Sequence, residues 1–312
     1  MKLSTDNVLM LPPAQDHPAA SMAAIEAEQP SNVVRFRPRQ RKAQVPMAHS
    51  GNALRKASDD TYTLGQLWHA IEHDRVVNHY QPLFDLDTGR VVAAEALVRV
   101  EDENGELMFP DRFIELAESS GMIVPLGRAV IRQVCADLAN WRRRGVSIGR
   151  VSINLSAQQL NVDDVLATFV AKMLDLHDLC HSDLEFELTE RQALDLAGPA
   201  RQTLQALVDA GARLALDDFG VGFSSLSYLT ELDVHTVKLD RTMTHKLPEH
   251  VATATVTRHI LAMAVDLGLT VVGEGIETQA QRNHLQFAGC HLGQGFLLAR
   301  PMSQEALLEQ LL

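Results

Sequence analysis

The chain has 312 residues, of which 46% are hydrophobic, so it can bury the core of one large domain. Its formal net charge of −12 argues against stable nucleic-acid binding through phosphate neutralisation, but not against one small anionic ligand held by cations. Three widely spaced cysteines and the lack of a long apolar run or a signal peptide argue against a disulfide framework, a membrane span and secretion, and predict a cytoplasmic protein.

The first 60 residues differ in composition from the rest of the chain. They hold eight Lys or Arg against six Asp or Glu, and six prolines without a sustained hydrophobic period, which is typical of disorder. Basic residues between Arg35 and Lys42 could contact nucleic acid, anionic lipid or a protein partner, or could belong to a solvated tail. We therefore expect a disordered, partly basic tail over residues 1–60 and one folded domain over residues 61–312.

Regular patterns begin after Thr61. A helix is expected over Leu64–His73, followed by two strand-like runs, VVNHYQPLFDL and VVAAEALVRV. The short segment Asp87–Gly89 between the two runs has turn chemistry, so the pair is predicted to form an antiparallel hairpin.

Helices and strands then alternate to the end of the chain. Repeated βα units predict a parallel sheet, and about eight strands predict that it closes into a TIM-like (β/α)8 barrel, led irregularly by the hairpin. Helices are expected near residues 110–119, 126–144, 157–177, 199–210, 224–229, 251–267, 278–288 and 303–311, and strands at 150–155, 184–189, 213–217, 235–240, 270–274 and 295–298.

Most of the expected strands carry a carboxylate, amide or amine side chain at or near the end. Strand periodicity places Asn154, Glu187 and Lys238 on the face opposite the apolar residues, which points them toward the barrel axis at the mouth where such barrels hold active sites. An ordinary solvated lysine is the alternative interpretation of Lys238. The full series is Glu95, Asn154, Glu187, Asp217, Asp218, Lys238, Glu274, Glu277 and Gln294.

Six carboxylates in this series would repel one another at a shared site. Hard divalent cations with oxygen ligands resolve that conflict, and Asn154 adds a neutral oxygen. Asp217 and Asp218 would point to opposite faces of a regular strand. At a strand end, where the chain turns at Gly220, both could reach one site, and a shared aspartate could bridge two metals. His69 and His73, one helical turn apart, are interpreted as a polar helix face because no third ligand is evident.

These residues lie in motifs that resemble the EAL-domain family of bacterial cyclic di-GMP phosphodiesterases. The resemblance covers about residues 64–312 and implies a TIM-like barrel with an antiparallel first strand. It depends on HYQPLFDLDTGRVVAAEALVRV, SINLSAQQL, FELTE, LALDDFGVGFSSLSYL, HTVKLD, VVGEGIET and GCHLGQGFLLARP.

The resemblance also implies roles for single residues. Lys238 matches the lysine that contacts the attacking water, and Arg99 matches a phosphate contact. Glu190 matches a brace for the loop after Asp218, which the family uses to couple dimerisation to metal binding. Val221 in that loop departs from the usual small or hydroxyl residue. Glu95, Asn154, Glu187 and Asp217 match ligands of one metal, Asp217, Asp218 and Glu274 surround a second, and Glu277 and Gln294 match second-sphere and substrate-side positions.

The expected activity is hydrolysis of cyclic di-GMP to linear pGpG by a homodimer with two Mg²⁺ or Mn²⁺ ions per active site, which would lower a second messenger of biofilm and motility signalling. Glu274 could serve as a metal ligand or accept a proton. An inactive EAL module that acts as a cyclic di-GMP receptor, or as a protein-binding regulator, is the alternative. Such modules normally lose metal ligands, whereas every matched ligand is present here.

Overall fold

The computed structural model describes residues 62–163, 165–194, 196–220 and 228–312. The expected tail over residues 1–60 lies outside the described residues, as do Val221 and the rest of segment 221–227. No helix in the described ranges is long and apolar enough to cross a lipid bilayer.

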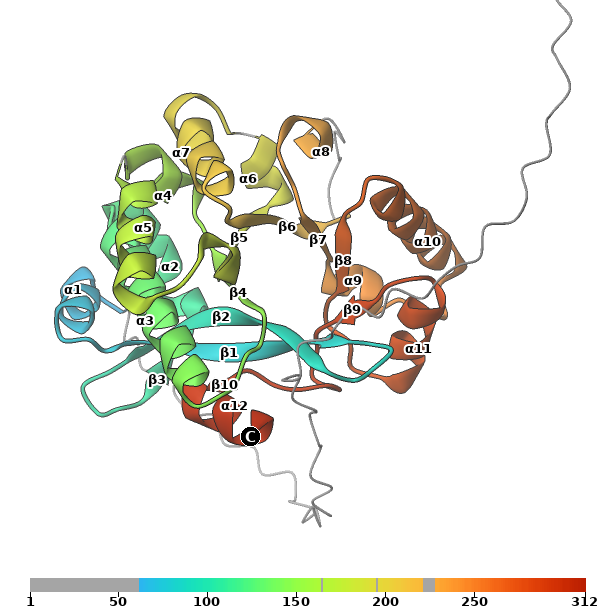
Figure 1. Cartoon of the computed structure of the whole chain (residues 1–312), viewed down its shortest axis with the longest axis horizontal. Coiled ribbons are helices and arrows are strands. Elements are labelled where there is room, and N and C mark those ends of the chain that lie inside the picture. The colour runs from blue at the N-terminus through green and yellow to red at the C-terminus, as the bar shows by residue number, and fades with distance from the viewer. Residues whose placement is uncertain (1–61, 164, 195, 221–227) are drawn as a thin grey trace, which may run out of the picture. The chain divides into compact units, whose positions relative to one another are not determined.

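Eight strands form a closed barrel, and Figure 1 shows them as a ring with the helices outside it. The first strand runs antiparallel to both of its neighbours in the ring, while the remaining pairs are parallel, so the predicted barrel with an antiparallel first strand is confirmed. In ring order the strands are β1 (Val76–Asp85), β2 (Val91–Glu101), β4 (Arg150–Asn154), β5 (Leu184–Thr189), β6 (Arg213–Phe219), β7 (Thr236–Leu239), β8 (Thr270–Gly273) and β9 (Leu292–Gly293).

Two short strands extend this sheet outside the ring. β3 (Leu107–Met108) pairs with the end of β2, and β10 (Met302–Ser303) pairs with β1. The hairpin turn between β1 and β2 forms because Asp85 Oδ1 accepts hydrogen bonds from the backbone N–H of Asp87 (3.0 Å) and Thr88 (2.7 Å). Gly89 closes the turn at φ +67°, a backbone angle that favours glycine.

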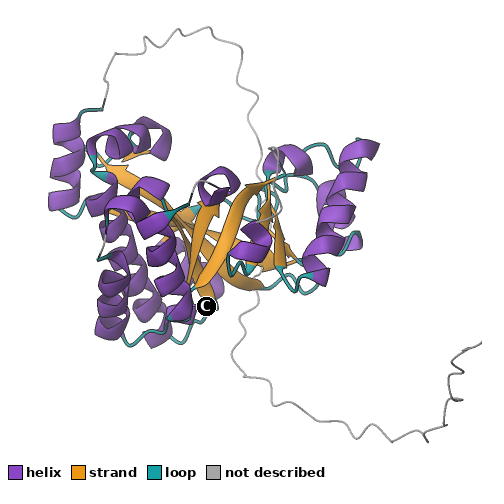
Figure 2. Cartoon of the chain, turned by 90° about the horizontal axis from the view of Figure 1, so that it is seen from above, coloured by secondary structure: helices purple, strands orange, loops and turns teal. Residues whose placement is uncertain are grey.

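The helices cover the outer face of the barrel (Figure 2), where the alternate, apolar side chains of the strands pack against them. Capping boxes set the starts of α1 and α11. The longer helices are α1 (Leu64–Glu72), α2 (Ile114–Ser120), α3 (Ile123–Arg143), α5 (Leu166–His177), α7 (Gly198–Asp209), α10 (Val251–Asp266), α11 (Gln279–Phe287) and α12 (Gln304–Leu311), and the short ones are α4 (Ala157–Val162), α6 (Glu190–Leu194), α8 (Tyr228–Glu231) and α9 (Arg241–Thr244), with 3₁₀ turns at Pro110–Arg112 and His181–Asp183.

Two expected elements are wrong. The helix predicted over residues 157–177 is two helices, α4 and α5, because the chain leaves the helical path at Asp163, whose fully buried carboxylate accepts a hydrogen bond from Arg128 Nε at 3.0 Å. The strand predicted at residues 295–298 is a turn, and the last strand of the ring, β9, ends before it. Leu297 N–H donates to Ile276 O at 3.0 Å, so the backbone folds onto the loop after β8.

A buried carboxylate joins the hairpin to α3. Asp137 accepts hydrogen bonds from Tyr80 Oη (2.6 Å) and Gln133 Nε2 (3.0 Å). The Tyr80 ring meets Trp141 edge to face, with 4.9 Å between the ring centroids. Burial raises the pKa of Asp137 to about 6, although both hydrogen bonds lower it. The folded state therefore keeps the proton on Asp137 up to a higher pH than the unfolded state does.

We expect Asp137→Asn to flatten the pH dependence of stability. Between the ordinary pKa of about 4 and the folded value of about 6, the native state holds a proton that the unfolded state has lost, so wild-type stability falls as the pH rises through this window. The neutral amide avoids that loss, and the variant should be more stable than wild type at pH 7.5 by up to about 3 kcal/mol. Urea denaturation at pH 5 and 7.5 measures the difference.

The matched control is Asp175→Asn, on an exposed position of α5. A variant at position 137 that is clearly less stable than wild type at pH 7.5 would show that the hydrogen bonds to the ionised carboxylate outweigh its burial.

Candidate functional site

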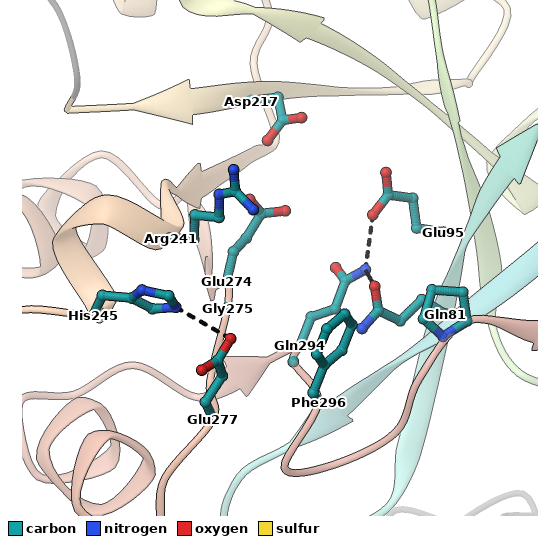
Figure 3. A pocket seen from close by; sticks show the side chains of 12 residues that line it. Gln81, Glu95, Asp217, Arg241, His245, Glu274, Gly275, Glu277, Gln294 and Phe296 are labelled. Atoms are coloured by element: carbon teal, nitrogen blue, oxygen red, sulfur yellow. Dashed lines mark hydrogen bonds and ion pairs between the residues drawn. The ribbon is translucent and has the colours of Figure 1, made fainter. Parts of the chain in front are cut away.

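A cavity of about 320 Å³ opens at the C-terminal ends of the barrel strands, and Figure 3 shows the residues that line it. The side chains come from both halves of the chain, and carboxylates predominate among the charged groups. The lining residues are Gln81, Glu95, Asp217, Arg241, His245, Glu274, Gly275, Glu277, Gln294, Gly295, Phe296 and Pro301.

The ammonium of Lys238 lies beneath this cavity among four carboxylates. Its side chain is 1% exposed, so the alternative of a solvated lysine is wrong, and the expected position on the barrel axis is confirmed. The distances from Nζ are 2.7 Å to Glu187 Oε2, 2.9 Å to Glu274 Oε1, 3.4 Å to Glu95 Oε2 and 3.6 Å to Asp217 Oδ1.

The cluster holds more negative charge than one lysine can balance. Burial lowers the pKa of Lys238, but the surrounding carboxylates outweigh it and raise this pKa well above its usual value. Burial also raises the pKa of Glu187 well above its ordinary range, and that of Glu274 to about 8. Because a raised carboxyl pKa means that the folded state holds a proton, Glu274 lowers stability as the pH rises from about 4.5 to 8.

Amide side chains hold Glu95 in place. Asn154 Nδ2 donates to Glu95 Oε1 at 3.0 Å, and Gln294 Nε2 donates to Glu95 Oε2 at 2.8 Å and to Gln81 Oε1 at 3.0 Å. Burial raises the pKa of Glu95, but Lys238 and the two amide donors outweigh it, and the net direction is downward. Glu95 is therefore a buried carboxylate that stays ionised.

Asp217 and Asp218 lie on a bulge in β6. Between two paired positions the chain advances three residues on β6, from Leu216 to Phe219, but only two on β7. Asp218 adopts a positive φ of 56°. The bulge re-aims consecutive side chains that a regular strand would send to opposite faces. Asp217 faces the cavity, whereas Asp218 is more exposed and is not among the cavity-lining residues. The bulge that orients Asp217 and Asp218 thus lies before Gly220, where the sequence predicted that the chain turns.

Three further predicted residues lie outside the group of carboxylates around Lys238. Glu277 lines the cavity, and its Oε1 lies 3.4 Å from His245 Nε2. Glu190 Oε2 accepts a hydrogen bond from the backbone N–H of Gly220 at 3.4 Å, the contact expected of a brace. Arg99 is buried on β2 but does not line this cavity.

The donor set fits hard divalent cations, since carboxylate and amide oxygens from four strands converge and Glu187 Oε1 is buried without a hydrogen-bond partner. Within the described ranges, however, no three His, Cys, Asp or Glu side chains are already arranged around one metal position. Lys238 Nζ lies within 3.6 Å of four of these carboxylates and balances part of their charge.

Sequence reasoning missed several lining residues. Gln81, Arg241, His245 and Phe296 face the cavity, and Figure 3 shows Arg241 and His245 on the side opposite Gln294. Position after a strand could have identified Arg241, which follows β7 by two residues. The predicted hairpin could have identified Gln81, which lies directly opposite Glu95 in the β1–β2 register. No local signal identifies His245.

A second cavity, of about 420 Å³, lies on the other side of Glu95 and Asn154. Apolar side chains from β2, α2 and α3 line most of its wall, and Gln159 contributes a buried amide nitrogen without a hydrogen-bond partner. Of the carboxylates around Lys238, Glu95 lines both the polar cavity and this apolar one. That arrangement can bind cations, orient a water molecule and hold an anionic substrate with planar apolar parts.

Comparison with known proteins relates this chain to a family. The family model of the EAL domain matches residues 65–301. The bifunctional diguanylate cyclase/cyclic di-GMP phosphodiesterase MucR of Pseudomonas aeruginosa is 36% identical over 252 residues, which are 81% of this chain and 37% of MucR. The cyclic di-GMP phosphodiesterase PdeR of Escherichia coli is 37% identical over 233 residues, 75% of this chain and 35% of PdeR. Across five such relatives this chain spans 29% to 46% of their length.

Solved structures agree with the family match. The PaMucR phosphodiesterase in complex with c-di-GMP superposes with a TM-score of 0.73 at 36% identity, covering 78% of this chain and 98% of PaMucR. The EAL domain of Mycobacterium smegmatis DcpA gives a TM-score of 0.64 at 36% identity, covering 76% and 97%.

Lys238→Met should destabilise the protein through repulsion between the carboxylates that surround Lys238. The variant keeps a long side chain but leaves the carboxylates without their ammonium, so at pH 7.5 without metal its free energy of unfolding should fall by about 3–5 kcal/mol. The loss should shrink at pH 5.5, where protonation neutralises carboxylates, and Mn²⁺ should stabilise the variant more than wild type. Chemical denaturation with and without Mn²⁺ measures both effects.

Lys246→Met, at an exposed position after α9, is the matched control. Equal stability of wild type and Lys238→Met in metal-free buffer at pH 7.5 would show that Lys238 does not hold the carboxylates together.

Proposed function

Because this chain belongs to the EAL domain family, we propose that it hydrolyses cyclic di-GMP to linear pGpG in a reaction that requires Mg²⁺ or Mn²⁺. The observation that carries the proposal is the buried group of Glu95, Glu187, Asp217 and Glu274 around one lysine at the mouth of the barrel. The whole activity is a proposal because the chain spans less than half of the curated relatives that are named phosphodiesterases.

Two groups of residues would hold the cations. We assign Glu95, Asn154, Glu187 and Asp217 to one ion, and Asp217, Asp218 and Glu274 to the other, with Asp217 shared. When bound, the ions would lower the pKa of a water molecule and neutralise charge on the phosphate. The bulge in β6 supports the sharing role, because it allows Asp217 to face the cavity while Asp218 follows it on the same rim.

The chain's own residues would then position and deprotonate the attacking water. Lys238 has three N–H donors and no acceptor, so it can hold the water by its oxygen once the ammonium releases a carboxylate. Glu274 Oε1 lies 2.9 Å from Lys238 Nζ, close enough to accept a proton from a water that Lys238 holds, which is the alternative to its role as a metal ligand. The water oxygen bonds to phosphorus as its proton passes to the acceptor, and the bond from phosphorus to the 3′ oxygen breaks. The leaving 3′ oxygen takes up a proton from solvent, so the products carry a 5′ phosphate and a 3′ hydroxyl.

Other residues would bind the rest of the substrate. Glu277 and Gln294 line the polar cavity, and Gln294 is fixed by its hydrogen bonds to Glu95 and Gln81. We assign Arg99 to a substrate phosphate. Its burial supports a charge-assisted contact, because a guanidinium away from water gains more from an anion than an exposed one does.

An inactive module that binds cyclic di-GMP as a receptor, or that regulates a protein partner, remains the alternative function. The lysine between the carboxylates would suit a receptor if it stayed in place after the nucleotide bound. Retention of every expected oxygen ligand favours the enzyme.

Purified protein should hydrolyse cyclic di-GMP with Mg²⁺ or Mn²⁺ and lose turnover with a chelator. Glu95→Gln and Asp217→Asn keep the side-chain shape but remove a charged ligand, so each should lower kcat by about 100-fold or more. Chromatographic detection of pGpG measures turnover, and Glu115→Gln, on the exposed face of α2, is the control. Binding without cleavage in the presence of Mn²⁺ would favour the receptor.

The predicted coupling between the loop after Asp218 and metal binding gives a separate expectation. Glu190→Ala removes the acceptor for Gly220 N–H, so the backbone next to the aspartate pair loses its brace. The variant should bind Mn²⁺ about 10-fold more weakly and turn over more slowly. Glu190→Gln keeps an acceptor and should stay closer to wild type. If self-association orders this loop, activity per molecule should rise with protein concentration in wild type.

Turnover measured against Mn²⁺ concentration at several protein concentrations tests this coupling. If Glu190→Ala and wild type show identical metal dependence at every protein concentration, the segment after Asp218 does not affect metal binding.

A further inference from the structure

Arg99 is a buried cation with unused hydrogen-bonding capacity. The residue is 6% exposed, and its Nη1 donates to Val98 O at 2.8 Å, while its Nε is buried without a partner. None of the ion pairs formed within the described ranges involves Arg99. Since a guanidinium carries five N–H donors in a fixed fork, Arg99 is equipped to bind an anion that the protein itself does not supply.

Phe109 covers one side of this guanidinium. The Arg99 Cζ lies 4.8 Å from the centroid of the Phe109 ring, within the range of a cation–π contact. The Phe109 residue is 55% exposed, so the ring shields the cation on one side and meets solvent on the other. An aromatic ring so exposed contributes little to the core, and its clearest partner is Arg99.

The hairpin between β2 and β3 explains why these two side chains meet. Its pairing places Val100 opposite Met108 and Glu101 opposite Leu107. Continuing that antiparallel register by one residue brings position 99 opposite position 109, and directly opposed residues on one face of a hairpin are in side-chain contact.

The turn of this hairpin fixes the register. Asp102 Oδ1 accepts hydrogen bonds from the backbone N–H of Asn104 and Glu106, each at 2.8 Å, and Gly105 supplies a positive φ of 80°. Pro110 restricts the preceding residue to extended angles, and Phe109 adopts φ −93° and ψ 157°. The position of the ring over Arg99 is therefore set by backbone geometry from both sides.

We propose that Phe109 is a positioning residue, which holds the Arg99 guanidinium in the orientation and low-dielectric surroundings that favour a substrate phosphate. This inference rests on the proposed function, because it takes the anion to be a phosphate of cyclic di-GMP. Val98 and Pro110, the neighbours of this pair, line the apolar cavity together with Glu95. The Arg99–Phe109 pair thus stands beside a cavity that reaches the carboxylate cluster.

The effect should appear in substrate binding rather than in the chemical step. Without the ring, the guanidinium gains water and rotational freedom, both of which weaken its contact with a phosphate. Phe109→Ala should raise KM for cyclic di-GMP by about 3- to 30-fold and change kcat by less than about 2-fold. Phe109→Tyr keeps the aromatic face and should restore KM, whereas Phe109→Leu, which has no π face, should not.

A double-mutant cycle separates this role from general packing. If Phe109 acts through Arg99, then Phe109→Ala should have little further effect on KM in an Arg99→Ala background. Phe287→Ala, which removes an aromatic ring that is 94% exposed on α11, is the matched control. Steady-state kinetics of the full chain with cyclic di-GMP and Mn²⁺ give KM and kcat, and calorimetric Kd values give the same comparison without turnover.

Different results would contradict the positioning role of Phe109 and the proposed hydrolysis. An unchanged KM and Kd in Phe109→Ala, or an equal effect of that change with and without Arg99, would overturn the positioning role while leaving the hydrolase intact. A fall in kcat at constant KM would also contradict it. A wild-type protein that binds but does not cleave cyclic di-GMP would remove the proposed hydrolysis, and the Kd comparison would still decide the role of Phe109. A protein that does neither would refute both.

Discussion

The charge balance inside the barrel is the constraint on which the site depends. Carboxylates from β2, β5, β6 and the loop after β8 are brought within 3.6 Å of the ammonium of Lys238. Four anions cannot share such a buried space unless cations or protons compensate them. One lysine offsets part of the negative charge. Burial and the neighbouring carboxylates still raise the pKa of Glu187 and Glu274. The same excess of negative charge makes this end of the barrel a candidate for divalent cations.

At the opposite end of the barrel interior, a buried carboxylate has enough hydrogen-bond donors around it to balance its charge. Glu185 lies one strand repeat below Glu187, and it accepts hydrogen bonds from Arg150 (3.0 Å), Arg213 (3.3 Å) and Thr236 (2.6 Å). Burial raises the pKa of Glu185, but these partners outweigh it and lower the pKa. Glu185 and Glu187 are the same residue type, and the side chain of each is 1% exposed. Only the layer at the strand ends is left short of positive charge, which is typical of a functional rather than a structural cluster.

Two irregularities of the sheet convert this scaffold into a shaped site. The bulge in β6 turns Asp217 toward the cavity at the point where the β6–β7 ladder loses register. The short β2–β3 hairpin places Phe109 over Arg99 beyond the mouth of the barrel. Both departures lie at strand ends, where the ladder can be interrupted without opening the barrel. A regular barrel provides the position of the site, and local departures from regularity aim its side chains.

The sequence by itself determined the barrel, its antiparallel first strand and most of the residues at the strand ends, because strand periodicity and turn chemistry are local properties. It also placed Asn154, Glu187 and Lys238 on the inward face. Other features depend on contacts between distant segments, such as the hydrogen bond from Gln294 to Gln81 across 213 residues. Tertiary structure alone decided that Lys238 lies between the carboxylates and that β6 bulges. It also decided that residues 295–298 form a turn, because their apolar side chains match a strand as well as a turn until the backbone partners are known.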